Sequence, residues 1–194
     1  MPEPVFSEVI SDLLTSHFTH LNEGSGISIE VMKERGYRSV LGKDELAKAG
    51  FTSSQQRTSG ILIPLWGVDG VQVGYQYRPD NPRSDSRQRP VKYESPVGSS
   101  NHLDCPPRCT PMLGDPKTPL WITEGSKKAD ALATHGACVI SLTGVWGFKG
   151  KNEFGAITIL SDWDRIAIKD RLVYLAFDSD IVSKELVRKA LEHL

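Results

Sequence analysis

The chain has 194 residues, a net charge of −1 and a charged fraction of 24%. This length suits one large domain or two small ones. A near-neutral charge excludes a protein that is basic over its whole surface, so any nucleic-acid-binding surface is local. Three cysteines do not make an even disulfide framework and indicate a reducing, cytoplasmic setting. No apolar run is long enough to span a membrane, so we expect no membrane partner.

The first 52 residues predict a small helical region. Apolar residues recur at helical spacing over 5–22. A second short helix is expected to begin after Ser28, which can cap it, and to end at Gly36. A third helix is expected to end at Gly50.

Residues 60–97 change to a period of two and predict an antiparallel hairpin followed by a basic loop. The hairpin strands are 61–66 and 71–77, with a turn at Asp69-Gly70. The basic loop carries four arginines between positions 78 and 89, and "VKYESPVG" after it predicts a short strand. Residues 98–119 are rich in Pro, Gly and Ser and predict an irregular linker.

The last third alternates strands and helices, which predicts an α/β fold with a parallel sheet. The expected order is strand, helix, strand, glycine-rich loop, a helical or irregular segment, strand and helix, at 120–123, 126–136, 137–144, 145–155, 156–168, 171–180 and 183–194.

Two of the predicted strands end in acids, Glu124 on one and Asp178 with Asp180 on the other. Ligands of open α/β sheets bind beyond the carboxyl ends of the strands. Converging carboxylates repel one another unless a cation lies between them, and Mg²⁺ binds carboxylates while keeping water and substrate phosphates as further ligands. We therefore expect a divalent metal site, although these acids could instead cap helices and turns.

A Glu-Gly pair after an apolar strand, followed by a helix and a later strand ending in Asp-x-Asp, resembles the TOPRIM domain of bacterial-type primases, topoisomerases and some nucleases. The resemblance implies that Glu124, Asp178 and Asp180 are catalytic and hold Mg²⁺ or Mn²⁺. The "EGSKKADAL" form looks like a variant family of phage and plasmid replication proteins. Primases usually place an acid four residues after the Glu, where this chain has Lys128, and the nearest acid is Asp130.

The preceding stretch is similar to primase catalytic cores, because "LIPLWGVDGVQVGYQYRP" and "VKYESP" occur in the order found there. This resemblance implies that Arg78, Lys92 and Tyr93 line a groove for template or nucleotide phosphates. Arg and Lys neutralise phosphate, and an aromatic ring can stack on a base. Ordinary solvated charge is the alternative for Arg78 and Lys92.

Three further lysines are candidates for phosphate contact. Lys127 and Lys128 fall in the first turn of a predicted helix, where cations oppose the helix dipole and a solvated face is the other explanation. Lys149 lies among Gly144, Gly147 and Gly150, where backbone N–H groups could cradle phosphate or simply form a flexible loop.

The sequence thus predicts a TOPRIM-like parallel-sheet domain at 120–194, truncated at its C-terminus, after a mixed α+β primase-core-like subdomain at 1–119 that contains the antiparallel hairpin. The expected function is primer synthesis by a primase-like nucleotidyltransferase of a mobile-element replication protein. Single-stranded DNA, nucleoside triphosphates and an associated helicase are the expected partners. A non-catalytic nucleotide- or nucleic-acid-binding module and a metal-dependent nuclease are the alternatives.

Overall fold

A computed structural model describes residues 11–144, 146–151 and 154–177. The chain divides into two compact units, one formed by residues 1–64 and 74–99 and the other by residues 65–73 and 100–194. Residues 100–119, which the sequence assigns to the N-terminal subdomain, therefore group with the second unit.

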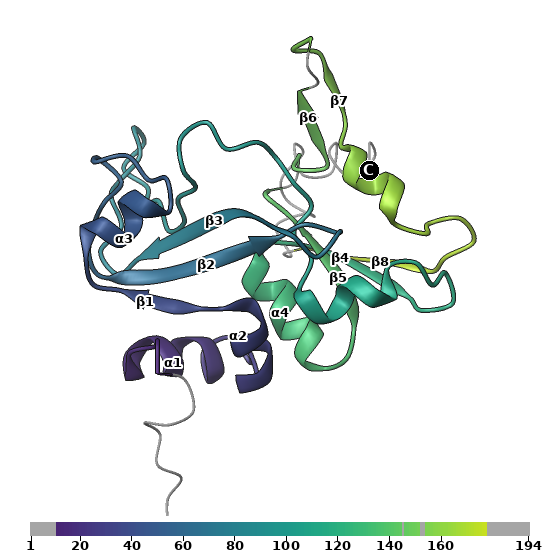
Figure 1. The fold of residues 1–194 in the computed structure, drawn as a ribbon, viewed down its shortest axis with the longest axis horizontal. Coiled ribbons are helices and arrows are strands. Elements are labelled where there is room, and N and C mark those ends of the chain that lie inside the picture. Colours follow the sequence, from purple (N-terminus) through teal and green to yellow (C-terminus); the bar gives the residue numbers. More distant parts are fainter. Residues whose placement is uncertain (1–10, 145, 152–153, 178–194) are drawn as a thin grey trace, which may run out of the picture. The chain divides into compact units, whose positions relative to one another are not determined.

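The first unit combines short helices with a three-stranded sheet in the order β1-β2-β3 (Figure 1). Strand β1 pairs antiparallel with β2, with Arg38 beside Leu62, and the two strands of the predicted hairpin, β2 and β3, are neighbours. Its elements in chain order are α1 (Thr15–Asn22), α2 (Ile29–Arg35), β1 (Arg38–Val40), α3 (Lys43–Lys48), β2 (Gly60–Trp66) and β3 (Gln72–Pro79).

Helix α2 has the predicted ends. The Ser28 side chain accepts a hydrogen bond from the Val31 N–H, and Gly36 follows the helix with φ of 82°, a left-handed conformation that favours glycine. Helix α1 begins at Thr15, so the expected helix over 5–22 is shorter in its described part, and residues 1–10 lie outside that part.

The expected strand over "VKYESPVG" is wrong. Only Glu94 pairs, in an isolated bridge where Glu94 and Tyr77 exchange two backbone hydrogen bonds of 2.8 Å. Proline has no N–H to donate, and Pro90 and Pro96 flank the bridge on either side. The bridge still fastens this segment to the end of β3.

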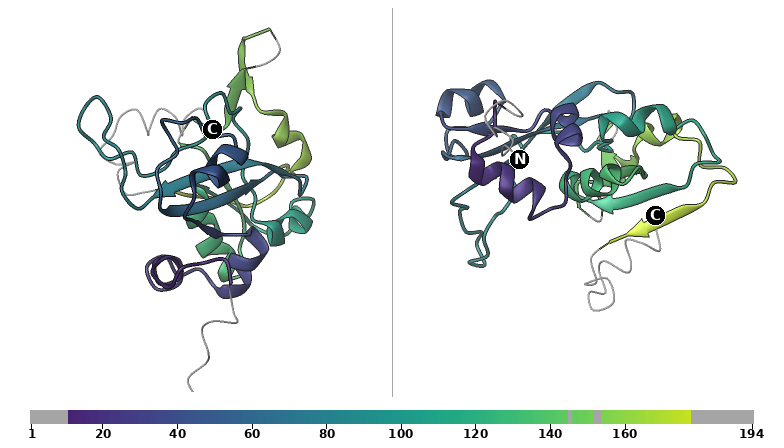
Figure 2. Two further views of the ribbon diagram at one scale, coloured as in Figure 1. Left: turned by 60° about the vertical axis from the view of Figure 1, so that its left-hand side comes forward. Right: turned by 90° about the horizontal axis from the view of Figure 1, so that it is seen from below.

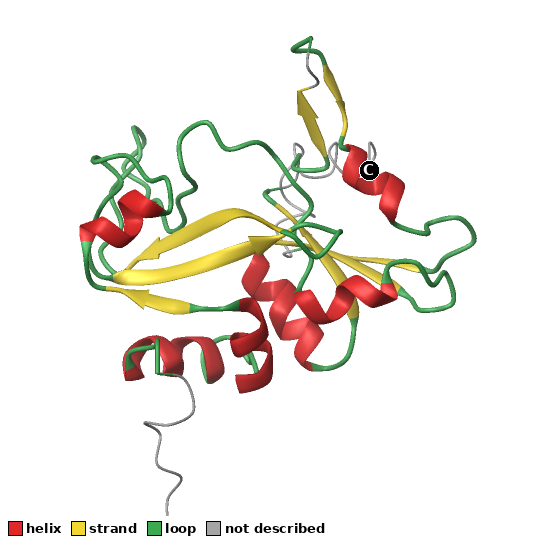
Figure 3. Cartoon of the chain, viewed as in Figure 1, coloured by secondary structure: helices red, strands yellow, loops and turns green. Residues whose placement is uncertain are grey.

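The second unit contains the predicted parallel sheet, in the order β5-β4-β8 (Figure 3). Helix α4 connects β4 to β5 and packs on both strands. The elements are β4 (Leu120–Glu124), α4 (Ser126–Thr134), β5 (Cys138–Leu142), β6 (Lys149–Lys151), β7 (Ile157–Ile159) and β8 (Val173–Ala176), with 3-10 helices at Pro107–Met112 and Ser161–Arg165. The α/β class with a parallel and an antiparallel sheet is confirmed.

Strands β6 and β7 form an antiparallel hairpin where the sequence suggests a loop and an irregular segment. The hairpin extends away from the parallel sheet of its own unit in both Figure 1 and Figure 2. Its apolar residues are strongly exposed, with Ile157 at 75% and Ile159 at 60%. The sequence pattern of a buried strand is therefore missing here.

The expected irregular linker at 98–119 instead supplies part of a hydrophobic core. Leu103, Cys105, Cys109 and Leu113 are buried together with residues of β4, α4 and β5. Pro and Gly content in this segment reflects a 3-10 helix and turns packed against the sheet, which composition alone does not separate from a mobile connection. Within the described part of the chain, no helix is long and apolar enough to cross a membrane.

Candidate metal and nucleic-acid site

Glu124 is the last residue of β4, at the carboxyl edge of the parallel sheet. It lies beside Leu142, the last residue of β5, and Thr123 lies beside Ala176, the last residue of β8. The three strands therefore end at one edge, and the Glu124 side chain is half-buried there. An acid in this place faces the region where open α/β sheets bind ligands.

The chain turns sharply after Glu124 into helix α4. Gly125 has φ of 78° and ψ of 140°, a combination that side chains rarely tolerate, and its N–H donates to the Leu142 carbonyl at 3.1 Å. Gly125 occupies the cap position of α4 and has no side chain, so Glu124 is not the N-cap residue. This answers in part whether Glu124 caps or ligates.

Two side-chain hydroxyls lie beside Glu124 in the chain, and the sequence predicted no role for either. Thr123 is buried, and its Oγ1 donates to the Ala176 carbonyl at 2.6 Å, which ties the end of β8 to the end of β4. Ser126 is 3% exposed, and its Oγ has no hydrogen-bond partner among the described residues. A threonine or serine next to a strand end is common, so its identity alone predicts neither a bond to a neighbouring strand nor an unpartnered hydroxyl.

The other predicted ligands, Asp178 and Asp180, lie outside the described residues. They follow Ala176, the last residue of β8, by two and four positions in the sequence. Within the described part, no group of three or more His, Cys, Asp or Glu side chains could hold a metal ion. Glu124 and the unpartnered Ser126 hydroxyl are oxygen donors, the kind that Mg²⁺ and Mn²⁺ prefer, so the described residues fit such an ion in part.

Three of the predicted basic residues belong to the same unit as Glu124. Lys127 is half-buried and Lys128 exposed, and both lie in the first turn of α4, directly after the Glu124-Gly125 turn. Lys149 is the first residue of β6, and its ammonium lies 5.4 Å from the centre of the Trp146 ring and 4.9 Å from that of Phe148. All three cations follow Glu124 in the sequence, two of them within four positions of it.

The other predicted basic and aromatic residues belong to the first unit. Arg78 is on β3, Lys92 is exposed in the following loop, and Tyr93 precedes the Glu94 bridge. Burial raises the pKa of the Tyr93 hydroxyl, and the nearby Arg78 guanidinium opposes that shift through its charge and a hydrogen bond. Arg78 and Tyr93 are thus brought together as a charged and aromatic pair.

Two arginines of the basic loop are already paired with acids. Arg83 Nε donates to Glu94 Oε1 at 3.2 Å, and Arg89 makes two hydrogen bonds to Asp85 Oδ2 at 3.0 and 2.8 Å. The pKa of the Asp85 carboxyl lies below its usual value. The hydrogen bond from the Arg89 backbone N–H to Asp85 Oδ1 contributes most, and the Arg89 side chain and the Arg87 N–H lower it further. Two of the four arginines of this loop are therefore neutralised locally by acids.

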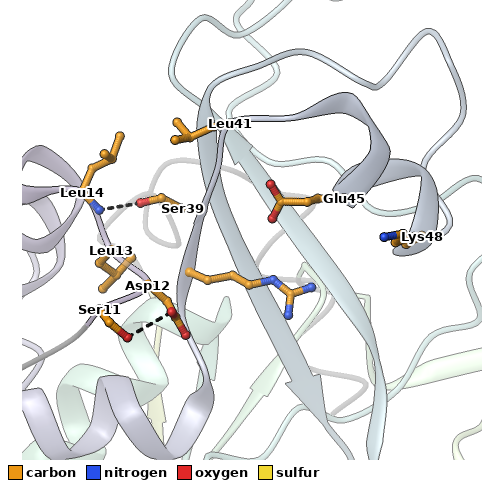
Figure 4. Close-up of a pocket in the computed structure, with 9 residues that line it drawn as sticks. Ser11, Asp12, Leu13, Leu14, Ser39, Leu41, Glu45 and Lys48 are labelled. Atoms are coloured by element: carbon orange, nitrogen blue, oxygen red, sulfur yellow. Dashed lines mark hydrogen bonds between the residues drawn. The ribbon is translucent and has the colours of Figure 1, made fainter.

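A histidine-centred network in the first unit was also missed. His17 Nδ1 lies 2.6 Å from Ser39 Oγ, and His17 Nε2 lies 2.9 Å from Asp80 Oδ1. The Leu14 N–H donates to the same Ser39 Oγ at 2.7 Å (Figure 4). The network therefore joins the start of α1 to β1 and to the residue after β3. No spacing in the sequence indicates this contact, because its members are far apart in the chain.

Ser39 also lines a pocket of about 540 Å³ in this unit. Leucines from the segment before α1 and after β1 contribute apolar wall, and Glu45 and Lys48 contribute opposite charges from α3 (Figure 4). None of the predicted site residues lines it. A second pocket, of about 440 Å³ in the other unit, is lined by apolar side chains such as Ile122 and Leu175 and offers nothing to a phosphate.

One family model and one curated protein match this chain. A family model described as "Domain of unknown function (DUF3854)" matches residues 110–194. An uncharacterized protein of Picosynechococcus sp. is 25% identical over 218 residues, which cover 85% of this chain and 22% of that protein.

Solved primase structures share the fold. The Aquifex aeolicus primase (zinc binding and RNA polymerase domains) has a TM-score of 0.59 at 14% identity, covering 93% of this chain and 46% of that chain. A DnaG primase catalytic domain bound to ssDNA has a TM-score of 0.57 at 16% identity, with coverage of 92% and 57%. The E. coli primase catalytic core has a TM-score of 0.55 at 17% identity, with coverage of 92% and 59%.

The fold of this chain is therefore similar to primase catalytic cores. The chain spans about half the length of these solved primases and about a fifth of the curated relative.

Proposed function

We propose that this chain is the primase-like nucleotidyltransferase core of a mobile-element replication protein. It binds single-stranded DNA and nucleoside triphosphates in the cytoplasm and synthesises primers with Mg²⁺ or Mn²⁺. One observation carries the proposal: Glu124 ends the middle strand of a parallel sheet, on a glycine turn into a helix, within a fold similar to primase catalytic cores.

In this proposal Glu124, Asp178 and Asp180 hold the metal. The bound ion would supply positive charge to the phosphates of the incoming nucleotide. The strands ending together support a shared site, because Thr123 fastens β8 to β4 one residue before Glu124. Lys127 and Lys128, in the first turn of α4 after that edge, would contact phosphate oxygens.

The first unit would hold the nucleic-acid backbone. Arg78 and Lys92 would neutralise phosphates, and Tyr93, adjacent to Lys92 and close to Arg78, would orient the arginine or stack on a base. The paired state of Arg83 and Arg89 leaves these residues as the better candidates among the basic groups near β3.

The test is primer synthesis by the chain and by Glu124→Gln. Labelled ribonucleotides are incubated with a single-stranded DNA template and Mg²⁺ or Mn²⁺, and products are resolved by size. Template-dependent oligonucleotides from the wild type, lost by at least about 100-fold in the variant, support the proposal, since charge stabilisation supplies much of such catalysis. Equal activity of both proteins would refute it.

A non-catalytic module that binds nucleic acid or nucleotide for an attached helicase is the second candidate. Lys128 favours it, because primases usually have an acid in that position. This candidate predicts metal-dependent ligand binding by a wild type that makes no primers, with or without a helicase present.

A further inference from the structure

A cluster of two aromatic rings and one cation follows strand β5. Trp146 and Phe148 are stacked, with ring centres 5.9 Å apart and an angle of 27° between the rings. Phe148 is 2% exposed, whereas Trp146 keeps 42% of its surface exposed. The Lys149 ammonium lies above both rings. The buried ring thus supports an exposed one.

The cluster lies in the segment that follows the end of β5, where Leu142 pairs with Glu124. Trp146 follows Leu142 by four residues. An exposed tryptophan at the carboxyl edge of a parallel sheet lies where ligands of such sheets bind. Sequence alone favours packing for both rings, and the structure separates a packed Phe148 from an exposed Trp146.

The backbone around Trp146 is fixed by contacts of its own. The Gly147 N–H donates to the Gly144 carbonyl at 2.8 Å, and a Cβ on Gly147 would lie 2.6 Å from the Thr143 nitrogen. Asn101 joins both ends of the loop, since its Nδ2 donates to the Lys149 carbonyl at 2.9 Å and its Oδ1 accepts from Thr143 Oγ1 at 3.3 Å. A ring held this way loses little conformational freedom when a ligand stacks on it.

Lys149 supplies a charge that the described residues leave uncompensated by any carboxylate. The Lys149 ammonium contacts the Trp146 and Phe148 rings there. Stacking platforms for single-stranded nucleic acid combine an aromatic face for the base with a cation for the phosphate. Trp146 and Lys149 provide both within four residues.

We infer that Trp146, supported by Phe148, stacks on a nucleobase whose phosphate contacts Lys149. This inference rests on the proposed function, because it deepens the site at the Glu124 edge. The ligand is a base bearing a phosphate, from an incoming nucleoside triphosphate or from single-stranded DNA. Lys149 moves from the rings to the phosphate when the ligand binds.

The test measures binding in EDTA, so that the metal site does not contribute. Fluorescein-labelled oligothymidine is titrated by anisotropy, and ATP by competition and by tryptophan quenching. Trp146→Leu should weaken binding about 5- to 150-fold, the range found for a stacked base, and Trp146→Phe should recover most of it. The ligand that loses affinity identifies the source of the base.

Two further variants sharpen the result. Phe154→Leu removes an aromatic side chain that is 85% exposed in the β6–β7 connection and should leave binding unchanged. Lys149→Met should reduce the salt dependence of oligothymidine binding by about 0.7 in the log–log slope, the value for one phosphate contact on a single strand. Circular dichroism and urea unfolding of each variant check that the fold is kept.

Equal affinities of wild type and Trp146→Leu for both ligands overturn the inference and leave the proposed function standing. Trp146-dependent binding by a protein that makes no primers supports the inference and removes the proposed function. If the wild type binds neither ligand in EDTA, the inference is wrong, and primer synthesis with Mg²⁺ or Mn²⁺ still decides the proposed function.

Discussion

Arg171 is expected to be a main determinant of how strand β8 is held, although the sequence gives it no role. The residue is 7% exposed and lies two positions before the first residue of β8. Its guanidinium makes five hydrogen bonds, to the carbonyls of Thr118 (2.7 Å), Leu113 (2.8 Å), Met112 (3.1 Å) and Ala167 (3.2 Å) and to Cys138 Sγ (3.3 Å).

Four of those partners are backbone carbonyls that no substitution at 171 removes, and two of them, of Leu113 and Met112, also accept from the N–H groups of Ala167 and Asp115. A carbonyl left without a donor costs about 1 kcal/mol, so loss of the donor to Thr118 and Ala167 in Arg171→Met should destabilise the second unit by about 2 kcal/mol before any relief from removing a buried charge. A lysine donates from a single nitrogen and cannot reach carbonyls spread along the guanidinium fork. Losing one of these two donors would make Arg171→Lys about 1 kcal/mol less stable.

Urea unfolding followed by tryptophan fluorescence measures this change, because Trp66, Trp121, Trp146 and Trp163 all belong to the second unit. With a denaturant slope of about 1 kcal/mol per M, Arg171→Lys should lower the midpoint by about 1 M. Arg165→Lys, at an exposed position, should shift it by less than about 0.5 M. A shift for Arg171→Lys as small as that control would refute the argument that backbone carbonyls depend on the fork.

Three further predictions concern other single contacts. Gly125→Ala places a side chain at φ of 78°, should cost about 1–3 kcal/mol in urea unfolding and should weaken Mn²⁺ binding by displacing Glu124; unchanged stability and metal affinity would contradict the turn. Asp104→Ala leaves the Ser141 hydroxyl and the Trp66 N–H without their acceptor, so we expect a loss of about 2–3 kcal/mol, and an unchanged midpoint would mean that water replaces the carboxylate. Burial, with smaller effects of two nearby acids, raises the pKa of Tyr77 from 10.0 to about 12. The contribution of the neutral Tyr77 hydroxyl to stability is therefore complete below pH 10 and is lost as the pH rises towards 12. Phenolate absorbance and unfolding at pH 9 and 11.5 would detect this loss in the wild type, and Tyr77→Phe should not show it.

Local signals predicted the elements that depend on local chemistry. Ser28 and Gly36 mark the two ends of α2, because a cap and a left-handed residue act within a few positions. The buried runs of β4 and β5 and the glycine between Glu124 and α4 are equally local, and the parallel sheet follows from their alternation with a helix.

Features that depend on distant contacts were missed. The 100–119 segment enters a core because Leu103 and Cys109 meet residues of the sheet, which no composition shows. Likewise, Arg171 and the His17–Ser39–Asp80 network bring together groups that lie far apart in the chain. The β6–β7 hairpin was not predicted, because its apolar residues are exposed and its strands have three residues each.

Metal binding at the carboxyl edge of the parallel sheet is the central claim, and titration of Mn²⁺ into the isotope-labelled chain tests it most directly. We predict paramagnetic broadening of the amide signals of Glu124, Gly125 and Ser126 and of the segments after β5 and β8. In Glu124→Gln or Asp178→Asn, the same broadening should require an Mn²⁺ concentration at least about tenfold higher. Broadening that is absent from this edge, or that is unchanged in both variants, would contradict the account.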